Sequence, residues 1–341
     1  MTFDERVEVG TKLLLRAALL VGGVYFLYLL RDVALLVLFA VLTAAALTPA
    51  VTKLREWGLS RTAAVIITYL LLFLAGVTIL MIFVPVFFSE IKEFLGNWPK
   101  YSDRLGSLLS GLEAYMQNVG IAFDKQTFFA NIEGSVASWF GGFFSTTVNV
   151  FQGIIHAIGF FFLALYLSLE EKGIEKFFLM LTPDQYHKHA LSIASRMQGK
   201  VSQWLFGQAI LMLIAFTIYY IGLSIIGVPY ALAIAFFGGL MEILPYIGPV
   251  LAAIPAVLVG LLYSPGLGLI ALAFYFVAHQ VEAHIVAPQV MKRSADLNPV
   301  ALIIAILVGI ELGGPLGVIL AVPLTMMLSV FVEDIFIRKN A

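Results

Sequence analysis

The sequence predicts an all-α fold. We expect a polytopic membrane protein with about six full spans, two re-entrant helical hairpins that form an inverted repeat, and an amphipathic helical extramembrane domain. The first supporting observation is composition: 61% of the residues are hydrophobic and 12% are charged, whereas a soluble domain is about a quarter charged. The second is a series of apolar stretches close to the roughly 20 residues that cross a bilayer. The third is an apolar stretch with a proline- and glycine-rich break that occurs twice.

The N-terminal part, residues 1–88, is predicted to be a scaffold of membrane spans. Arg31 and Asp32 mark a tight turn between the first two spans, with a single long tilted helix as the alternative. Pro49 is predicted to end the second span. The acidic N-terminus shows no signal-peptide cleavage pattern, so the first apolar segment is expected to remain as a membrane anchor. The three predicted spans are 13–30, 33–50 and 63–88.

Residues 89–146 differ in character, because charges become frequent and apolar residues recur at helical spacing. This pattern predicts an amphipathic helical extramembrane domain, whose role is a solvated cap or oligomer contact, or alternatively a gate or surface-lying helix. Residues 147–202 are predicted to hold a fourth span and a cytoplasmic helical connector, in which Thr182 and Pro183 signal a helix start. Residues 203–341 form the predicted transport core, with two further spans and both hairpins.

The repeated stretch begins at Pro229 in the first copy and at Pro299 in the second. Each copy runs to an isolated glutamate, Glu242 or Glu311, and matched positions lie 68 to 70 residues apart. A broken apolar segment beside a carboxylate is typical of a re-entrant hairpin that lines a polar site. Chance similarity between apolar stretches is the alternative, but the ordered recurrence of these residues favours a repeat. The glutamates are followed by breaks that contain Pro245 and Gly248 in one copy, and Gly314, Pro315 and Gly317 in the other.

Loop charges predict how the chain is oriented, since cytoplasmic loops are enriched in lysine and arginine. The basic loops at 53–61, 172–188, 292–293 and 338–339 can all be cytoplasmic if the domain at 89–146 lies outside. The N-terminus is then cytoplasmic and each hairpin returns to its own side of the membrane. With one full span between them, the two hairpins enter from opposite sides, which is an inverted repeat.

Several classes of function are excluded or unsupported by the sequence. The net charge of −1 offers no basic surface for nucleic acid, and the absence of cysteine removes thiolate metal sites and cysteine nucleophiles. The chain has no H-E-x-x-H, G-x-S-x-G or P-loop motif, so an enzyme or an ATP-driven pump is unsupported. No cofactor is predicted. A secondary transporter, a channel or a membrane scaffold remains.

Polar side chains within the predicted spans are the candidate site residues, because they are costly there. Glu242 and Glu311 are expected to face one cavity, and a carboxyl group in a dry site can bind a proton and couple it to transport. The alternative is that both glutamates cap helix ends at an interface. Gln280, Glu282 and Gln208 are further candidates. On a helix, the neighbouring His279 shares a face with Glu282 but His284 is turned away from His279, so no metal site is predicted.

Several stretches of the chain carry a resemblance to a known family: 49–61, 227–232, 242–249, 280–288, 297–299 and 314–323. On these residues, the sequence resembles the autoinducer-2 exporter family of bacterial and archaeal membrane proteins over nearly its whole length. Where that family usually has a histidine, this chain has Asn298, followed by Pro299. The resemblance implies a secondary transporter of the cytoplasmic (inner) membrane that assembles as a homo-oligomer, a pentamer, and works by an elevator-like movement. Activities described in the family are export of autoinducer-2 and, in some branches, sodium–proton antiport.

The sequence therefore predicts a secondary transporter that exports a small polar solute, resembling autoinducer-2, with H+ or Na+ as a coupling ion and lipid as its surroundings. Sodium–proton antiport is the first alternative and a non-transporting membrane scaffold is the second. Gln280, Glu282, Asn298, Pro299 and Gln208 are expected to contribute to the site beside the two hairpin glutamates.

Overall fold

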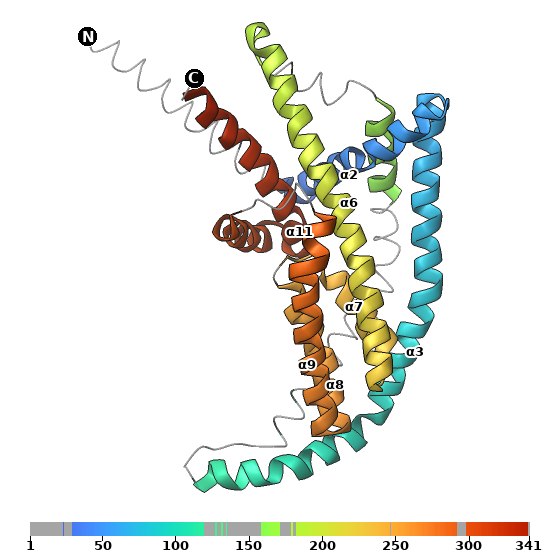
Figure 1. Cartoon of the computed structure of the whole chain (residues 1–341), viewed down its shortest axis with the longest axis vertical. Coiled ribbons are helices and arrows are strands. Elements are labelled where there is room, and N and C mark those ends of the chain that lie inside the picture. Colours follow the sequence, from blue (N-terminus) through green and yellow to red (C-terminus); the bar gives the residue numbers. More distant parts are fainter. Residues whose placement is uncertain are drawn as a thin grey trace, which may run out of the picture. The chain divides into compact units, whose positions relative to one another are not determined.

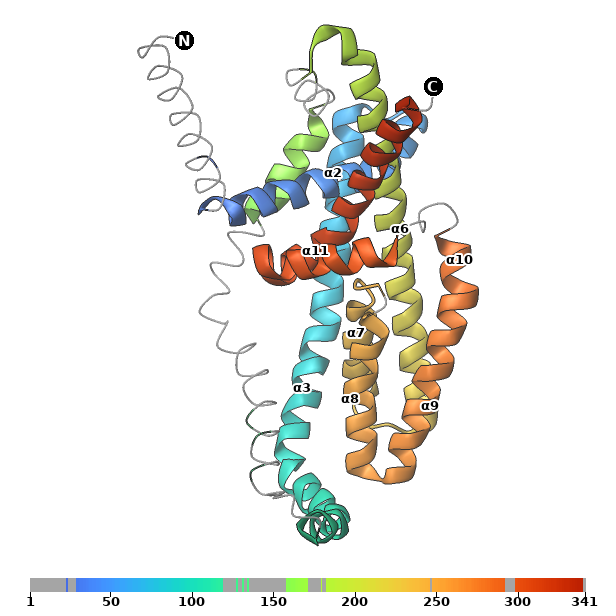
Figure 2. The same ribbon diagram turned by 90° about the vertical axis from the view of Figure 1, so that its left-hand side faces the viewer.

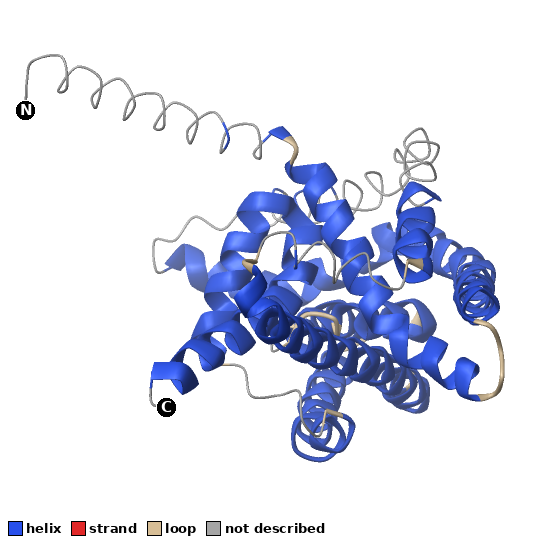
Figure 3. Cartoon of the chain, turned by 90° about the horizontal axis from the view of Figure 1, so that it is seen from above, coloured by secondary structure: helices blue, strands red, loops and turns tan. Residues whose placement is uncertain are grey.

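A computed structural model describes residues 29–118, 158–170, 182–245, 247–291 and 298–339, with a few isolated positions besides. Every element within these ranges is a helix (Figure 3), which confirms the all-α prediction. The elements are α2 (Arg31–Glu56), α3 (Arg61–Asn118), η1 (Asp184–Tyr186), α6 (His187–Ile226), α7 (Ala231–Met241), α8 (Gly248–Tyr263), α9 (Pro265–Val281), η2 (Glu282–Val286), α10 (Ala287–Val290) and α11 (Pro299–Lys339).

Five helical stretches in the described chain are long and apolar enough to cross a membrane. This supports a multi-pass membrane protein. The stretches are Arg31–Glu56, Arg61–Arg104, Asp184–Ile226, Pro265–Val290 and Pro299–Ile335. Ile158–Leu169, α7 and α8 are shorter apolar helices. The predicted span at 13–30, most of the second half of the amphipathic domain and the basic loop at 292–293 lie outside the described residues.

Two helices run further than the sequence pattern indicates. The prediction that Pro49 ends a helix is wrong, because α2 continues through it to Glu56. Membrane helices tolerate proline where hydroxyl side chains bond nearby carbonyl groups, and the Thr48 hydroxyl donates to the carbonyl oxygen of Ala44 at 3.0 Å. Similarly, α3 does not end at residue 88 but continues as one helix to Asn118, although the composition changes there. The composition change therefore does not mark the end of a helix.

The chain forms two compact units. The first contains residues 1–48, 160–201 and 297–341, and the second contains residues 49–159 and 202–296. Helix α6 contributes its N-terminal part to the first unit and its C-terminal part to the second. The core of the second unit contains side chains of α6, α7, α8 and α9, and Phe94 of α3 packs against it.

In the second unit, α7, α8 and α9 pack as consecutive antiparallel helices beside the C-terminal part of α6 (Figures 1 and 2). Small residues allow this close packing. A Cβ atom at Gly260 of α8 would lie 2.9 Å from the Cα of Gly268 in α9. The turn between these two helices is set by Ser264, whose hydroxyl accepts the backbone N–H of Leu267 at 3.1 Å.

In the first unit, α11 consists of two helices joined at Gly314, where φ is 55° and ψ is −137°. Only glycine adopts this backbone conformation without strain. The chain folds back there, since a side chain on Gly317 would collide with the backbone of Gly309. The first helical turn of α11 is capped by Asn298, whose Oδ1 accepts the N–H of Val300 at 2.9 Å.

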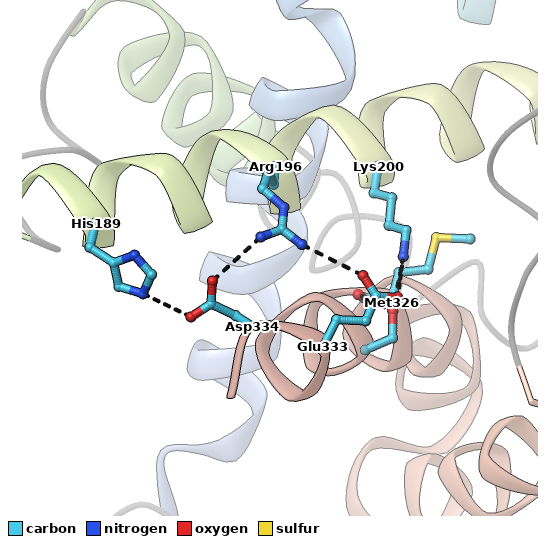
Figure 4. Close-up of polar contacts among 7 residues, drawn as sticks. His189, Arg196, Lys200, Met326, Glu333 and Asp334 are labelled. Carbon is cyan, nitrogen blue, oxygen red and sulfur yellow. Dashed lines mark hydrogen bonds and ion pairs between the residues drawn. The ribbon is translucent and has the colours of Figure 1, made fainter. Parts of the chain in front are cut away.

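Charged side chains also join the second half of α11 to the N-terminal part of α6 (Figure 4). Asp334 accepts hydrogen bonds from His189 at 2.7 Å and from Arg196 at 3.4 Å. Lys200 donates to Glu333 at 3.1 Å. The side chain of Asp334 is only 13% exposed, so this cluster excludes more water than an ordinary surface ion pair.

Replacing Asp334 with alanine is expected to destabilise the protein by about 1 kcal/mol, since His189 and Arg196 lose a partly buried acceptor while Arg196 itself stays solvated. The midpoint of thermal unfolding of the purified protein should fall by a few degrees. Asp184→Ala is the matched control, because Asp184 is fully exposed beside His187. Equal midpoints for the two variants would contradict a stabilising role for the cluster.

Candidate functional site

The break between α7 and α8 lies against α6, and Glu242 is its first residue. Its side chain is 5% exposed. The Gln208 side chain, also buried, donates a short hydrogen bond from Nε2 to the backbone carbonyl oxygen of Glu242. A broken helix leaves carbonyl groups without helical partners, and Gln208 satisfies one of them. This contact fixes the break to α6.

Glu242 and Glu282 converge on one tyrosine hydroxyl. The Tyr219 hydroxyl of α6 lies 3.5 Å from a carboxyl oxygen of Glu242 and 3.4 Å from one of Glu282. Because both contact the same hydroxyl group, the two carboxyl groups are near neighbours. Glu282 is 7% exposed and Tyr219 is 1% exposed, so all three polar groups are withdrawn from bulk water.

The face of α9 that meets this cluster carries two further polar atoms. The hydroxyl of Tyr275 and the Nδ1 atom of His279 are buried and have no hydrogen-bond partner among the described residues. The ring of Tyr275 lies 4.7 Å from that of Tyr219. An unpaired buried polar group costs about 1–3 kcal/mol, and such groups at a polar cluster indicate positions that a small ligand can fill.

Glu282 begins a π-helical turn, η2. Such turns widen a helix locally and are frequent at functional sites. The next histidine, His284, is exposed and lies close to the carbonyl oxygen of Gln280 at 3.0 Å. Within about one helical turn, Glu282 is therefore buried whereas its polar neighbours Gln280 and His284 are exposed.

The cluster of Glu242, Glu282 and Tyr219 has few hydrogens to donate compared with the oxygen atoms that can accept them. A tyrosine hydroxyl has one hydrogen to donate, while an ionised carboxylate only accepts. The hydroxyl of Tyr219 can satisfy only one of the two glutamates at a time. A hydrogen on one of the two carboxyl groups would supply the donor that is missing. The arrangement can therefore hold one removable proton, or a small cation in its place.

The predicted site residues fall into the two units. In the second unit, Gln208, Glu242 and Glu282 are brought together, Pro245 and Gly248 form the adjoining break, and Gln280 lies on the exposed face of α9. In the first unit, Glu311 is exposed, next to the kink of α11. The pairing of Glu242 with Glu311 stays a prediction. Also in the first unit are Asn298, Pro299, Gly314, Pro315 and Gly317.

The two hairpins share a local feature at matched positions of the repeat. Side chains on Gly248 and Gly317, which lie 69 residues apart, would each collide with a backbone carbonyl of the preceding helix, at Met241 and at Gly309. Each break thus brings two helical arms into backbone contact, for which glycine is needed.

The sequence prediction missed Tyr219 and Tyr275 as site residues and named His279 only as a neighbour of Glu282. Tyr219 follows Gln208 by eleven residues, which is three helical turns and places both on one face of α6. That spacing is a signal which could have identified Tyr219. Tyr275 could not be distinguished by pattern from the tyrosines expected at membrane interfaces.

The comparisons with known proteins agree with this architecture. A family model described as AI-2E family transporter matches residues 15–337. A Bacillus subtilis relative named "Putative transport protein YrrI" is 27% identical over 286 residues, which cover 83% of this chain and 81% of the relative. The "AI-2 transport protein TqsA" of Escherichia coli K12 is 24% identical over 307 residues, covering 87% of this chain and 84% of the relative.

A third relative, "Putative transport protein YhhT" of Escherichia coli K12, is 24% identical over 327 residues and covers 96% of this chain and 91% of its own length. The family match spans nearly the whole chain, including both hairpins and the buried acidic cluster. The resemblance noted in the sequence is confirmed, and this chain belongs to the AI-2E transporter family of multi-pass membrane proteins.

Proposed function

We propose that this protein is a secondary transporter that exports a small polar solute across the inner membrane and couples export to proton movement. The observation that carries the proposal is the pair of buried carboxyl groups, Glu242 and Glu282, on the single hydroxyl of Tyr219. A buried carboxyl pair that holds one exchangeable proton is a proton-binding site of the kind that proton-coupled transporters use.

The dimensions of the first hairpin support a re-entrant arrangement. Helix α7 has 11 residues and α8 has 16, so they extend about 17 and 24 Å at 1.5 Å per residue. Both fall short of the roughly 30 Å hydrocarbon core. If the hairpin enters and leaves on one side, its break and Glu242 lie within the membrane. The proposal further holds that the two hairpins are inverted relative to each other and that transport uses an elevator-like movement. It also places the N-terminus in the cytoplasm.

The class of solute follows from the polar atoms available. The Tyr275 hydroxyl and His279 Nδ1, which have no hydrogen-bond partner in the part of the chain that the structure describes, suit a small solute with hydroxyl groups. The name of TqsA assigns AI-2 transport to that relative, and we extend an autoinducer-2-like solute to this chain as the first candidate. Assembly as a homo-oligomer, a pentamer by family resemblance, is part of the same proposal.

Sodium–proton antiport is the second candidate. Two carboxyl oxygens and a tyrosine oxygen at one point are hard ligands of the type that small hard cations prefer. A sodium ion and a proton would then compete for the same pair, and exchange of one for the other would be the transport reaction.

The protein reconstituted in liposomes provides the test. A panel of small polar solutes, autoinducer-2 included, is measured with and without a proton gradient, and sodium gradients are applied with an internal pH indicator. We expect flux of at least one solute that depends on the proton gradient and stops with a protonophore. A sodium-driven pH change without solute flux would favour antiport. Fluxes equal to those of protein-free liposomes would contradict both candidates and favour a scaffold.

A further inference from the structure

The N-terminus of α7 is held by a residue from another helix. Its first turn has backbone N–H groups without helical partners, and Tyr230, the residue before α7, offers no side-chain hydrogen bond to it among the described residues. Instead, Glu90 of α3 accepts the N–H of Ala233 at 2.9 Å. None of the eleven residues of α7 has a polar side chain, so this carboxylate is a polar anchor supplied from outside.

A second set of contacts joins the same two elements. The hydroxyl groups of Tyr101 in α3 and Tyr230 lie 3.0 Å apart. The ring of Phe94 meets that of Tyr230 edge to face at 5.8 Å. Further along, Phe83 of α3 stacks on Phe236 of α7 at 4.6 Å. Helix α3 thus supports α7 from its entry to its middle, with Glu90 at the only charged contact described between them.

The opposite end of α7 carries Glu242. A helix of 11 residues is short and stiff, so a shift or rotation at Ala233 moves Glu242 with it, about 14 Å away along the helix axis. On the far side, glycine packing leaves α7 little freedom: a side chain on Gly239 would lie 2.8 Å from the Cβ of Phe216. The fit of Glu242 against Tyr219 therefore depends on where α3 holds the start of α7.

We propose that Glu90 is a positioning residue of the transport site, which anchors α7 to α3 and so sets Glu242 against Tyr219 and Glu282. This inference rests on the proposed function for its consequence in transport. To hold the N–H of Ala233, the side chain at position 90 must place an acceptor oxygen as far from the backbone as a glutamate does. It does not require that Glu90 touch the solute or the transported proton.

The natural chain has no cysteine, so a reporter thiol can be introduced at a single place. Ile247, in the break that begins at Glu242, is 40% exposed, and I247C can be labelled with a membrane-permeant maleimide in the folded full-length protein in detergent. We expect E90A to increase the labelling rate several-fold, because α7 and the break lose their anchor. E90Q should label at close to the original rate, since the amide oxygen of glutamine accepts the same N–H.

E90D is a second variant for the case in which E90A does not fold, because it keeps the charge but is one methylene too short. It should label faster than E90Q. The matched control is E93A, since Glu93 lies one turn away on α3 and is exposed. In proteoliposomes, E90D and E90A should lower the maximal rate of proton-driven flux, with E90Q restoring most of it.

Labelling rates for E90A and E90D equal to that of the parent, or E90Q as fast as E90A, would overturn the positioning role. The labelling rate does not depend on transport. Altered labelling together with no transport by the parent would therefore overturn the proposed function alone, and unaltered labelling with normal transport would overturn the positioning role alone.

Discussion

Replacing Glu242 with glutamine is expected to reduce proton-driven transport by about 100-fold or more, which is typical for loss of a group that transfers a proton. The substitution keeps the size and much of the hydrogen bonding of the side chain but removes the exchangeable proton. Since Glu242 contacts the same hydroxyl as Glu282, E282Q should have a similar effect. Flux in proteoliposomes under an imposed proton gradient measures both.

The double variant separates one shared site from two independent ones. If the two carboxyl groups bind one proton together, E242Q/E282Q should be little worse than either single variant, because residues that act as a unit are not additive. Independent losses that multiply would contradict a shared site. Glu93→Gln is the matched control, since this glutamate is exposed and its replacement should leave flux unchanged. Purification yield and elution volume establish that each variant is folded.

Replacing Gly248 or Gly317 with alanine is expected to destabilise the protein and abolish transport. A methyl group at either position meets backbone rather than a mobile side chain: Met241 at the first break and Gly309 at the second. Such overpacking costs about 1–3 kcal/mol where side chains can adjust, and a rigid backbone contact belongs at the upper end or beyond. Thermal unfolding of the purified variants and their flux in proteoliposomes measure the effect.

Glycines in open positions provide the control for these two variants. A Cβ atom added to Gly76 or Gly96 of α3 would have no described neighbour within 4 Å. Alanine there should be neutral or stabilise by about 0.5–1 kcal/mol, through the lower entropy of the unfolded chain. If G76A lowers the melting midpoint as much as G248A does, close backbone contact at the break is not what requires glycine.

Much of this architecture could be predicted from the sequence. Apolar length predicted membrane helices, and α2, α3, α6, α9 and α11 overlap predicted spans or hairpins. The breaks after Glu242 and Glu311 were predicted because proline and glycine interrupt apolar sequence. The ends of helices were less predictable, as Pro49 illustrates, because a proline within a membrane helix is tolerated when neighbouring groups bond the freed backbone.

The candidate site could be predicted only in part. Gln208, Glu242 and Glu282 stand out as polar residues in apolar surroundings, and each was named. Their convergence could not be predicted, because it depends on how the hairpin packs between α6 and α9. The sequence paired Glu242 with Glu311 through the repeat, whereas the contacts within the second unit join Glu242 to Glu282 through Tyr219. Which glutamate lies beside Glu242 is set by tertiary packing, so no local sequence pattern could predict it.

The central claim is that Glu242 and Glu282 share one proton, and infrared spectroscopy of the reconstituted protein tests it without knowledge of the solute. A protonated carboxyl group absorbs apart from an ionised one, so its signal can be followed as the pH is varied. We predict a titrating carboxyl band in the parent protein that is altered in E242Q and in E282Q and absent from the double variant. A band that remains unchanged in the double variant would contradict the claim.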